Sequence, residues 1–359
     1  MDKLRFAIIG AGNGGQAFAA HLTLLGCRVQ LYDIEPEKVA SLREARRIRL
    51  AGVLEGETEI PVITGDIAEA IGGSDIVMVV IPTIYQGSIA EAMAPHITLS
   101  QTIILNPGAT GGALEVRNTL RRHGAPAEVV VAETDTLLYA CRSPRPGEVV
   151  IHGVKEHVGI ATLPARQALR LTAALNTVFP QFQAVSSVLV TSLSNPNAMV
   201  HPAPTLLNAG RIESRSPFDY YSEGVTPSLA RVVERIDTER LAVARGLGVE
   251  VPSIQDFYLK SYGVRGPTLH EQIQQVRAYD GIKGPTALNT RYLLEDIPTG
   301  LVPLSYLGGA LGVSTPTMQA VVTLGSILLE RDFWREGRTL EKLGLERKSP
   351  EEIRRLVLE

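Results

Sequence analysis

The chain has 359 residues, of which 45% are hydrophobic and 20% charged, and its formal net charge is −3. This composition is typical of a soluble globular protein and the length favours two domains, while the lack of a basic block argues against nucleic acid or an anionic membrane as a partner. The apolar runs are shorter than the roughly 18 residues of a membrane span, the N-terminus does not resemble a secretory signal, and two distant cysteines favour a reducing compartment. We therefore expect a cytoplasmic protein.

The N-terminal residues carry the pattern of a nucleotide-binding loop. An apolar run of strand type, "LRFAII" (residues 4–9), leads directly into "GAGNGG", whose residues are Gly10, Ala11, Gly12, Asn13, Gly14 and Gly15. The following residues have helical spacing up to Gly26, and "RVQLYD" predicts a second strand that ends in Asp33. In a G-x-G-x-x-G loop the first glycine allows a tight turn, the second admits a pyrophosphate to the backbone amides, and the third lets the helix pack closely. The order of these elements predicts a dinucleotide site.

Asp33 predicts which dinucleotide is preferred. A carboxylate at the end of the second strand accepts hydrogen bonds from the ribose hydroxyls of NAD, whereas the 2′-phosphate of NADP would meet a like charge there. We therefore expect NAD to be preferred. Arg28 and Arg43 lie near Asp33 in the sequence and could compensate its charge, so the sequence also allows NADP.

Alternation of strands and helices continues to about residue 183. Apolar runs at residues 74–82 and 101–108, then "AEVVVAETDTL" and two within "GEVVIHGVKEHVGIATL", predict further strands. The fold class predicted is α/β, with a Rossmann-like, doubly wound parallel sheet over residues 1–183. Ligands bind at the carboxyl ends of such strands. We accordingly expect Pro82, Pro107 and Gly108, in the turns "PTIYQ" and "NPGATGG", beside the cofactor, although the second could be an ordinary turn before a helix.

Residues 184–359 predict an all-α second domain that closes over the cofactor face of the first. "SLARVVERIDTERLAVARGLG" places apolar residues at helical spacing with charges between them, and later segments are similar. Asn197 and His201 in "SNPNAMVHPAP" would share one helix face if the segment is helical, but Pro202 disfavours helical backbone at His201. Arg291 and Asp296 lie close together before a Pro-Thr-Gly turn.

These polar residues suit acid–base chemistry on a carboxylate substrate. A histidine oriented by a carboxylate can exchange protons near neutral pH, and an arginine fork can hold a substrate carboxylate. The residues alone leave simpler readings open: His201 could be a core side chain, and Arg291 and Asp296 could form surface ion pairs. Tyr220, Tyr221 and Glu223 could line an amino-acid site or simply pack. No histidine or cysteine spacing indicates a metal.

Five segments together resemble the octopine/nopaline (opine) dehydrogenase family, and most nearly its bacterial N-(1-carboxyethyl)-norvaline dehydrogenase type: "GAGNGGQAFAAHL", "ILNPGATGGALEVR", "SNPNAMVHPAPTLLNAGRIES", "YYSEGVTPS" and "LNTRYLLEDIPTGLVPLS". The resemblance implies a homodimeric enzyme that condenses a 2-oxo acid, usually pyruvate, with an amino acid and reduces the imine with NAD(P)H. It implies that His201 is the acid–base residue, Asp296 its partner and Arg291 the carboxylate ligand. Asn197 and Tyr221 would then bind substrate.

Three other functions are compatible with parts of the sequence. A reductase of a single 2-oxo or 2-hydroxy acid, similar to ketopantoate reductase, would use a lysine such as Lys260 or Lys283 as the acid. A non-catalytic NAD-binding sensor would have no need of His201, Arg291 and Asp296 together. An opine-type enzyme acting on a nicotianamine-like amine would need a larger, more polar pocket, which the sequence does not reveal.

Overall fold

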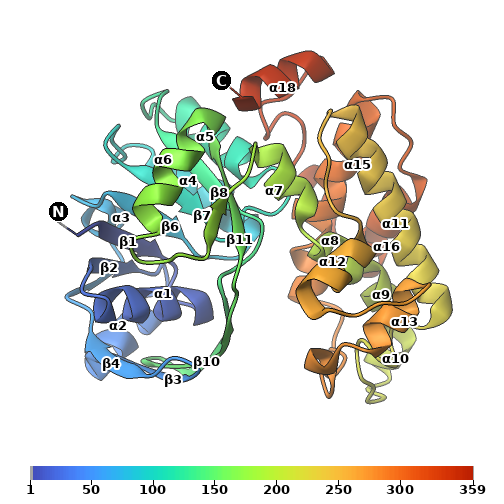
Figure 1. Cartoon of the computed structure of the whole chain (residues 1–359), viewed down its shortest axis with the longest axis horizontal. Coiled ribbons are helices and arrows are strands. Elements are labelled where there is room, and N and C mark those ends of the chain that lie inside the picture. The colour runs from blue at the N-terminus through green and yellow to red at the C-terminus, as the bar shows by residue number, and fades with distance from the viewer. Residues whose placement is uncertain (1–2, 359) are drawn as a thin grey trace. The chain divides into compact units, whose positions relative to one another are not determined.

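The computed structural model describes residues 3–358 and divides into two compact units (Figure 1). The first unit extends to Ser192 and takes in the chain again from Leu356, and the second is Leu193–Arg355. The chain therefore passes between the units twice. The boundary that the sequence predicted between residues 183 and 184 falls within strand β12, which pairs with β11 and so belongs to the sheet of the first unit.

The first unit is built on an eight-stranded sheet with the order β12-β11-β8-β7-β6-β1-β2-β5. Its strands are β1 (Arg5–Ile9), β2 (Arg28–Tyr32), β5 (Val62–Thr64), β6 (Ile76–Val79), β7 (Thr102–Leu105), β8 (Val130–Thr134), β11 (Val158–Leu163) and β12 (Phe182–Ala184). All neighbours are parallel except β8 and β11, which pair antiparallel. Runs such as "IVMV" in β6 are wholly buried because helices cover both faces of the sheet.

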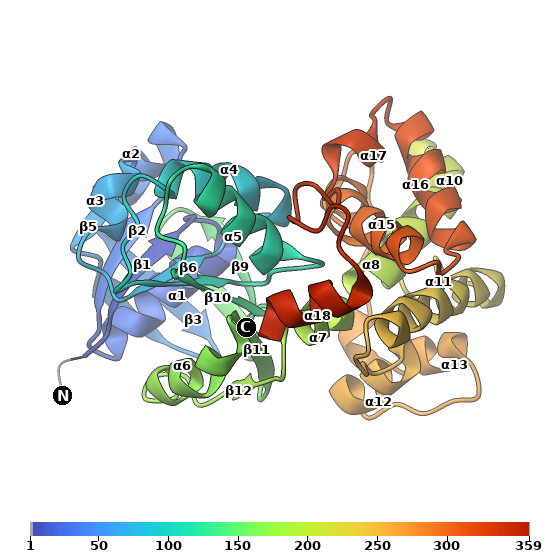
Figure 2. The ribbon, with the colours of Figure 1, turned by 90° about the horizontal axis from the view of Figure 1, so that it is seen from above.

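Figure 2 shows helices α3, α4 and α5 along one face of this sheet and α1 and α6 along the other. Their bounds, with α2, are α1 (Asn13–Leu24), α2 (Pro36–Ala45), α3 (Ile67–Ile71), α4 (Gln86–Met93), α5 (Gly112–Arg122) and α6 (Ala168–Leu175). The chain leaves β1 towards β2 on one side and returns to β6 on the other, so the topology reverses between β1 and β6. The expected α/β, doubly wound architecture is confirmed, with an antiparallel β11 added.

A second, four-stranded sheet of order β4-β3-β10-β9 packs on α1. It consists of β3 (Arg47–Gly52), β4 (Gly56–Glu59), β9 (Tyr139–Arg145) and β10 (Glu148–Val154). In β3 the buried residues Ile48 and Leu50 alternate with exposed arginines, because only one face of this sheet is covered. Strands β3 and β4 are not evident from the sequence, because their charged residues obscure the apolar alternation.

The second unit is helical, as expected. Its helices are α8 (Asn197–Val200), α9 (Pro202–Leu207), α10 (Ala209–Glu213), α11 (Pro227–Gly246), α12 (Ile254–Tyr262), α13 (Leu269–Gln274), α14 (Arg291–Leu294), α15 (Val302–Ala310), α16 (Pro316–Leu328) and α17 (Phe333–Glu336). Two more helices, α7 (Val188–Ser194) and α18 (Pro350–Leu358), contain the points where the chain changes unit. None of the helices within residues 3–358 has both the length and the apolar character that a membrane crossing requires.

Candidate active site

The glycine-rich loop between β1 and α1 has the shape that a dinucleotide requires. Gly10 has φ of +105°, which favours glycine, and a Cβ at Gly15 would overlap the carbonyl oxygen of Gly10. A Cβ at Gly12, by contrast, would have no described atom within 4 Å. Gly12 and Asn13 are exposed at the start of α1, and no side chain caps that helix. The loop thus presents open space and free backbone amides at the helix N-terminus, which fits a pyrophosphate.

The Asp33 carboxylate binds this loop directly. One oxygen accepts from the Ala11 backbone amide at 2.7 Å, and the other accepts from the Glu35 amide at 3.0 Å. The Lys38 ammonium lies 3.3 and 3.4 Å from the two oxygens. Asp33 is 6% exposed at the carboxyl end of β2, the position expected for the ribose. Its carboxylate therefore has a structural role in the loop as well as the predicted one toward the cofactor.

The end of β9 and the turn that follows it hold the start of α1. The Ser143 amide donates to Asn13 Oδ1 at 2.9 Å, and the Gly147 amide donates to Gln16 Oε1, also at 2.9 Å. Gln16 in turn donates to the Ala11 carbonyl at 2.9 Å. Asn13 and Gln16 are thus engaged in holding the turn against α1. Gln16 is not evident as a functional residue from the sequence; its role follows from its burial, since it is only 3% exposed.

Two alanine substitutions distinguish the roles of the glycines. Gly12→Ala is expected to leave the thermal unfolding midpoint unchanged, because its methyl group meets nothing, but to raise the Kd of NADH at least about tenfold by entering the space before the helix N-terminus. Gly15→Ala is expected to lower both stability, by about 1–3 kcal/mol, and affinity, because the loop must move. For both variants, calorimetry measures the stability and fluorescence titration measures the Kd of NADH. Wild-type affinity in Gly12→Ala would place the cofactor elsewhere.

The other predicted cofactor residues lie at the carboxyl ends of β6 and β7. Pro82 is exposed and follows the end of β6 by three residues, and Gln86 donates to the Pro107 carbonyl at 2.8 Å, which ties the two turns together. Gly108 is buried, and a Cβ there would overlap the Glu133 side chain. Pro82 and Pro107 are thus at the expected edge of the sheet, while Gly108 serves close packing against Glu133.

In the second unit the structure brings His201 and Asp296 together across 95 residues of sequence. His201 Nδ1 lies 2.7 Å from Asp296 Oδ2, and the two residues are 7% and 5% exposed. A carboxylate only accepts hydrogen bonds, so Nδ1 carries the proton and donates a hydrogen bond to Asp296. This leaves Nε2 for proton exchange. The pairing of a histidine with a carboxylate, which the residue types favour for acid–base work, is therefore present in the fold.

The backbone around this pair is irregular in a way that orients both side chains. His201 has helical φ and ψ of −103° and −55° and joins α8 to α9, which begins at Pro202. Its amide donates to the Asn197 carbonyl at 3.0 Å, so the helical turn that Pro202 made uncertain does form. Asp296 directly precedes η4 (Ile297–Leu301), a π-helical turn. Such turns are rare and occur frequently at functional sites.

Tyrosines surround the imidazole. The Tyr292 ring stacks on it, with centroids 4.2 Å apart and planes at 23°. Tyr221 OH lies 3.3 Å from Nε2, and burial raises the pKa of Tyr221 well above its ordinary value, so this phenol stays protonated and can donate to Nε2. Tyr279 stacks on Tyr221 with centroids 3.8 Å apart. His201 therefore has one face against the Tyr292 ring and its Nε2 beside the Tyr221 hydroxyl.

The structure places Arg291 and Asn197 less directly. The Arg291 side chain is 67% exposed, and its Nε lies 3.4 Å from Glu295 Oε2 on the same helical turn. Arg291 thus has the surface ion pair that the sequence left open as an alternative. Asn197 is partly buried, and its amide donates to Asn195 Oδ1 at 2.9 Å. Both residues belong to the segments that carry His201 and Asp296, but neither contacts the histidine side chain through a described interaction.

Tyr292 is the functional candidate that sequence analysis missed. It precedes Asp296 by four residues, so a helical reading of "RYLLED" would have placed the two on one face.

Lys283, a candidate acid for the alternative reductase, is bound to Asp219 at 2.5 Å and is 68% exposed. No group of three or more His, Cys, Asp or Glu side chains within residues 3–358 could hold a metal ion.

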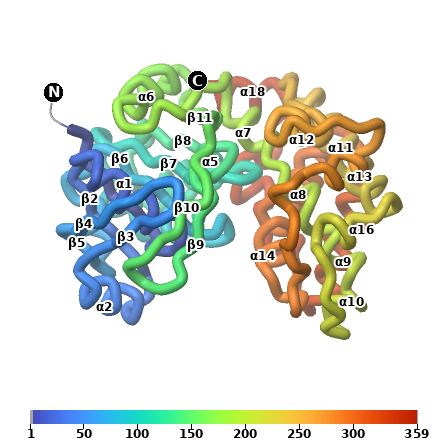
Figure 3. The backbone as a smooth tube through the Cα atoms, turned by 60° about the horizontal axis from the view of Figure 1, so that its bottom comes forward, coloured from blue at the N-terminus to red at the C-terminus, as the bar shows by residue number. Residues whose placement is uncertain are grey.

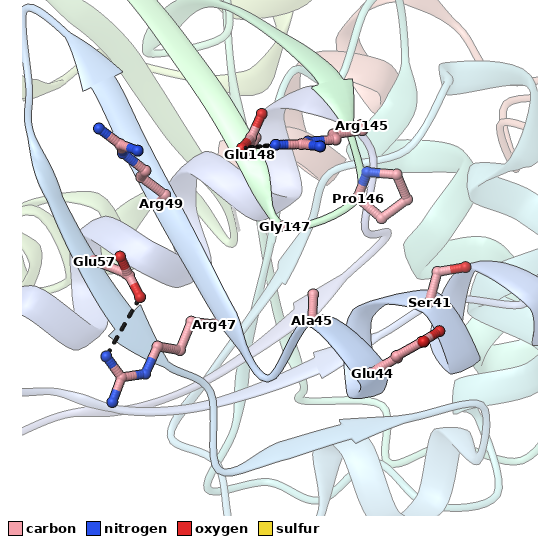
Figure 4. Close-up of a pocket in the computed structure, with 10 residues that line it drawn as sticks. All are labelled: Ser41, Glu44, Ala45, Arg47, Arg49, Glu57, Arg145, Pro146, Gly147 and Glu148. Atoms are coloured by element: carbon pink, nitrogen blue, oxygen red, sulfur yellow. Dashed lines mark hydrogen bonds and ion pairs between the residues drawn. The ribbon is translucent and has the colours of Figure 1, made fainter.

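A separate pocket of about 610 Å³ lies between α2 and the four-stranded sheet (Figure 4). Charged side chains line it, and two of its arginines pair with its glutamates: Arg47 with Glu57 at 3.3 Å and Arg145 with Glu148 at 2.5 Å. Its lining includes neither the glycine-rich loop nor Asp33. This pocket is therefore a charged surface hollow beside the small sheet.

Comparison with known proteins matches both parts of the chain. Residues 184–329 match the family described as NAD/NADP octopine/nopaline dehydrogenase, alpha-helical domain, and residues 5–122 match the N-terminus of NAD-dependent glycerol-3-phosphate dehydrogenase. An opine dehydrogenase from Arthrobacter sp. (strain 1C) is 47% identical over 96% of this chain and 96% of its own length.

Solved structures share the fold over nearly the whole chain. Octopine dehydrogenase with NADH and L-arginine aligns with a TM-score of 0.82 at 20% identity, covering 98% of each chain. Yersinopine dehydrogenase with NADP+ aligns with a TM-score of 0.77 at 19% identity, covering 98% of this chain and 95% of that one. Because the sequence identity to the Arthrobacter enzyme is so high and extends over both units, the chain belongs to the opine dehydrogenase family of NAD(P)-dependent oxidoreductases.

Proposed function

We propose that this enzyme condenses pyruvate with the amino group of an L-amino acid and reduces the resulting imine to an N-(1-carboxyethyl) amino acid. The observation that carries the proposal is the buried His201–Asp296 pair on the helical unit of an opine dehydrogenase. Imine formation needs protons to leave the amine and to reach the departing oxygen, and His201 can do both through Nε2 once substrate takes the place of the Tyr221 hydroxyl there. The bound nicotinamide cofactor supplies the hydride for the reduction.

The chain's own residues divide the remaining work in this proposal. Asp296 holds the Nδ1 proton and stabilises the imidazolium form of His201, while Tyr292 fixes the plane of the ring. Tyr221 keeps a donor at Nε2 until substrate arrives. Arg291, whose side chain is 67% exposed, binds the oxo-acid carboxylate as a fork once it is released from Glu295, which its Nε contacts at 3.4 Å. Asn197 positions the substrate.

We propose NAD as the preferred cofactor, because the Asp33 carboxylate lies just after β2, at the position from which an acid hydrogen-bonds the ribose hydroxyls of NAD in folds of this kind. We also propose that the enzyme is a homodimer in the cytoplasm. Helix α16 supports a dimer formed through the helical unit: Leu324, Ile327 and Leu328 share one face and are 47%, 67% and 45% exposed. The cytoplasm suits Cys27 and Cys141, which are buried and unpaired with each other. Sedimentation measures the oligomeric state.

The decisive experiment follows NADH consumption with pyruvate alone, with each of a panel of L-amino acids alone, and with the two together. Consumption that requires both substrates, with formation of the secondary amine seen by mass spectrometry, is the expected result. Consumption with the oxo acid alone would instead assign a single-substrate reductase. NADH that binds but is never consumed would favour a sensor.

A further inference from the structure

The surroundings of Asp33 contain a cation that the sequence did not single out. Lys38 Nζ lies 3.3 Å from Asp33 Oδ2 and 3.2 Å from Glu35 Oε2, and its side chain is 27% exposed. Lys38 stands in the first turn of α2, where the helix dipole disfavours a positive charge. The two carboxylates therefore hold it there.

The two arginines that could have compensated Asp33 do not reach it. Arg28 begins β2, whereas Asp33 follows the end of that strand; at about 3.3 Å per residue this separates them by roughly 16 Å. Arg43 lies further along α2, and its Nε donates to the Ile63 carbonyl at 2.7 Å. Of these three cations, only Lys38 is in contact with the acid.

Lys38 also competes for the atoms that a ribose would use. Each Asp33 oxygen already accepts a hydrogen bond from one backbone amide, Ala11 or Glu35. The Lys38 ammonium occupies the second acceptor site of both oxygens. Ribose hydroxyls that donate to Asp33 must displace the ammonium. Its flexible four-carbon stem lets the charge move to Glu35, which is exposed, or to an anion bound at the same place.

We propose that Lys38 lets this site accept NADP beside Asp33, and that it thereby weakens the preference for NAD that Asp33 creates. With NADP, the ammonium pairs with the 2′-phosphate and screens it from Asp33. With NAD, the same ammonium only competes for the Asp33 oxygens. This inference rests on the proposed use of a nicotinamide cofactor and adds the residue that discriminates its two forms.

The test is direct binding of NADH and NADPH, in the absence of substrates, by fluorescence titration. In Lys38→Met the Kd of NADPH is expected to rise about tenfold or more, because a charge-assisted hydrogen bond is lost, while the Kd of NADH stays within about threefold of wild type or falls. Lys38→Arg keeps the charge and should retain NADPH binding. Arg43→Met removes a cation from the same helix and should leave the ratio of the two Kd values unchanged.

The outcomes separate this inference from the proposed function. If wild type binds neither dinucleotide, the proposed function fails. If wild type binds and Lys38→Met keeps the wild-type ratio, or loses both cofactors equally, Lys38 does not discriminate and the inference is wrong. Lys38→Gln provides the same comparison with a polar side chain if the thermal unfolding midpoint shows that the methionine variant is misfolded.

Discussion

Replacing His201 by alanine is expected to lower kcat for opine formation by about 10²–10⁴-fold, the usual contribution of a positioned acid–base group. The reason is that Nδ1 is bound to Asp296, so proton exchange falls to Nε2, which lies beside the Tyr221 hydroxyl. The Kd of NADH should not change, because the glycine-rich loop and Asp33 belong to the other unit. Steady-state kinetics and fluorescence titration measure the two quantities.

His270 provides the matched control for this prediction. It lies in the same helical unit, but its Nδ1 contacts the Val225 carbonyl at 2.9 Å rather than a carboxylate. His270→Ala should therefore retain kcat close to wild type. Wild-type turnover in His201→Ala would remove the histidine from the mechanism, and equal losses in both variants would indicate damage to the fold.

Arg240→Met is expected to lower the free energy of unfolding by about 3–5 kcal/mol, the range for leaving one partner of a buried ion pair alone. Arg240 is 2% exposed and donates to Asp237 Oδ1 through Nε at 2.9 Å and Nη2 at 2.6 Å. It also donates to the Leu193 carbonyl and, at 2.6 Å, to that of Pro252. Its loss leaves a buried carboxylate and two carbonyls without this donor.

Arg235 on the same helix is the comparison. Its side chain is 60% exposed and lies 3.5 Å from Glu239, so Arg235→Met should cost at most about 1 kcal/mol. Urea denaturation followed by circular dichroism measures both variants. Similar losses in the two would contradict a special role for the buried pair. The double variant Arg240→Met with Asp237→Asn should recover part of the stability, because the charge left behind is removed.

The nucleotide-binding half of the fold could be predicted because its signals are local. The glycine motif, two strands and Asp33 lie within the first 33 residues, and their order alone determines the β1–α1–β2 unit. The contacts of Asp33 with Ala11 and Lys38 could not be predicted, since they depend on how the loop and the first turn of α2 fold back.

The His201–Asp296 pair, by contrast, could not be predicted from local sequence. No spacing rule links residues 95 positions apart, and only family resemblance brought them together before the structure did. The same resemblance implied a substrate role for Arg291, yet its described partner is Glu295, a neighbour in sequence. The residue types alone had left open that Arg291 forms a surface ion pair. The stacking of Tyr292 on His201 needed the three-dimensional arrangement of α14 beside α9 (Figure 3).

The return of the chain at Leu356 has a consequence for biosynthesis. Val357 is 1% exposed, and Arg117 of α5 donates to the Leu356 carbonyl at 3.3 Å, so residues translated after the helical unit form part of the first unit. Domains generally fold in the order in which the ribosome releases them. The N-terminal unit can therefore assemble its sheet early, but the segment that begins at Leu356 can join it only after the helical unit has been synthesised.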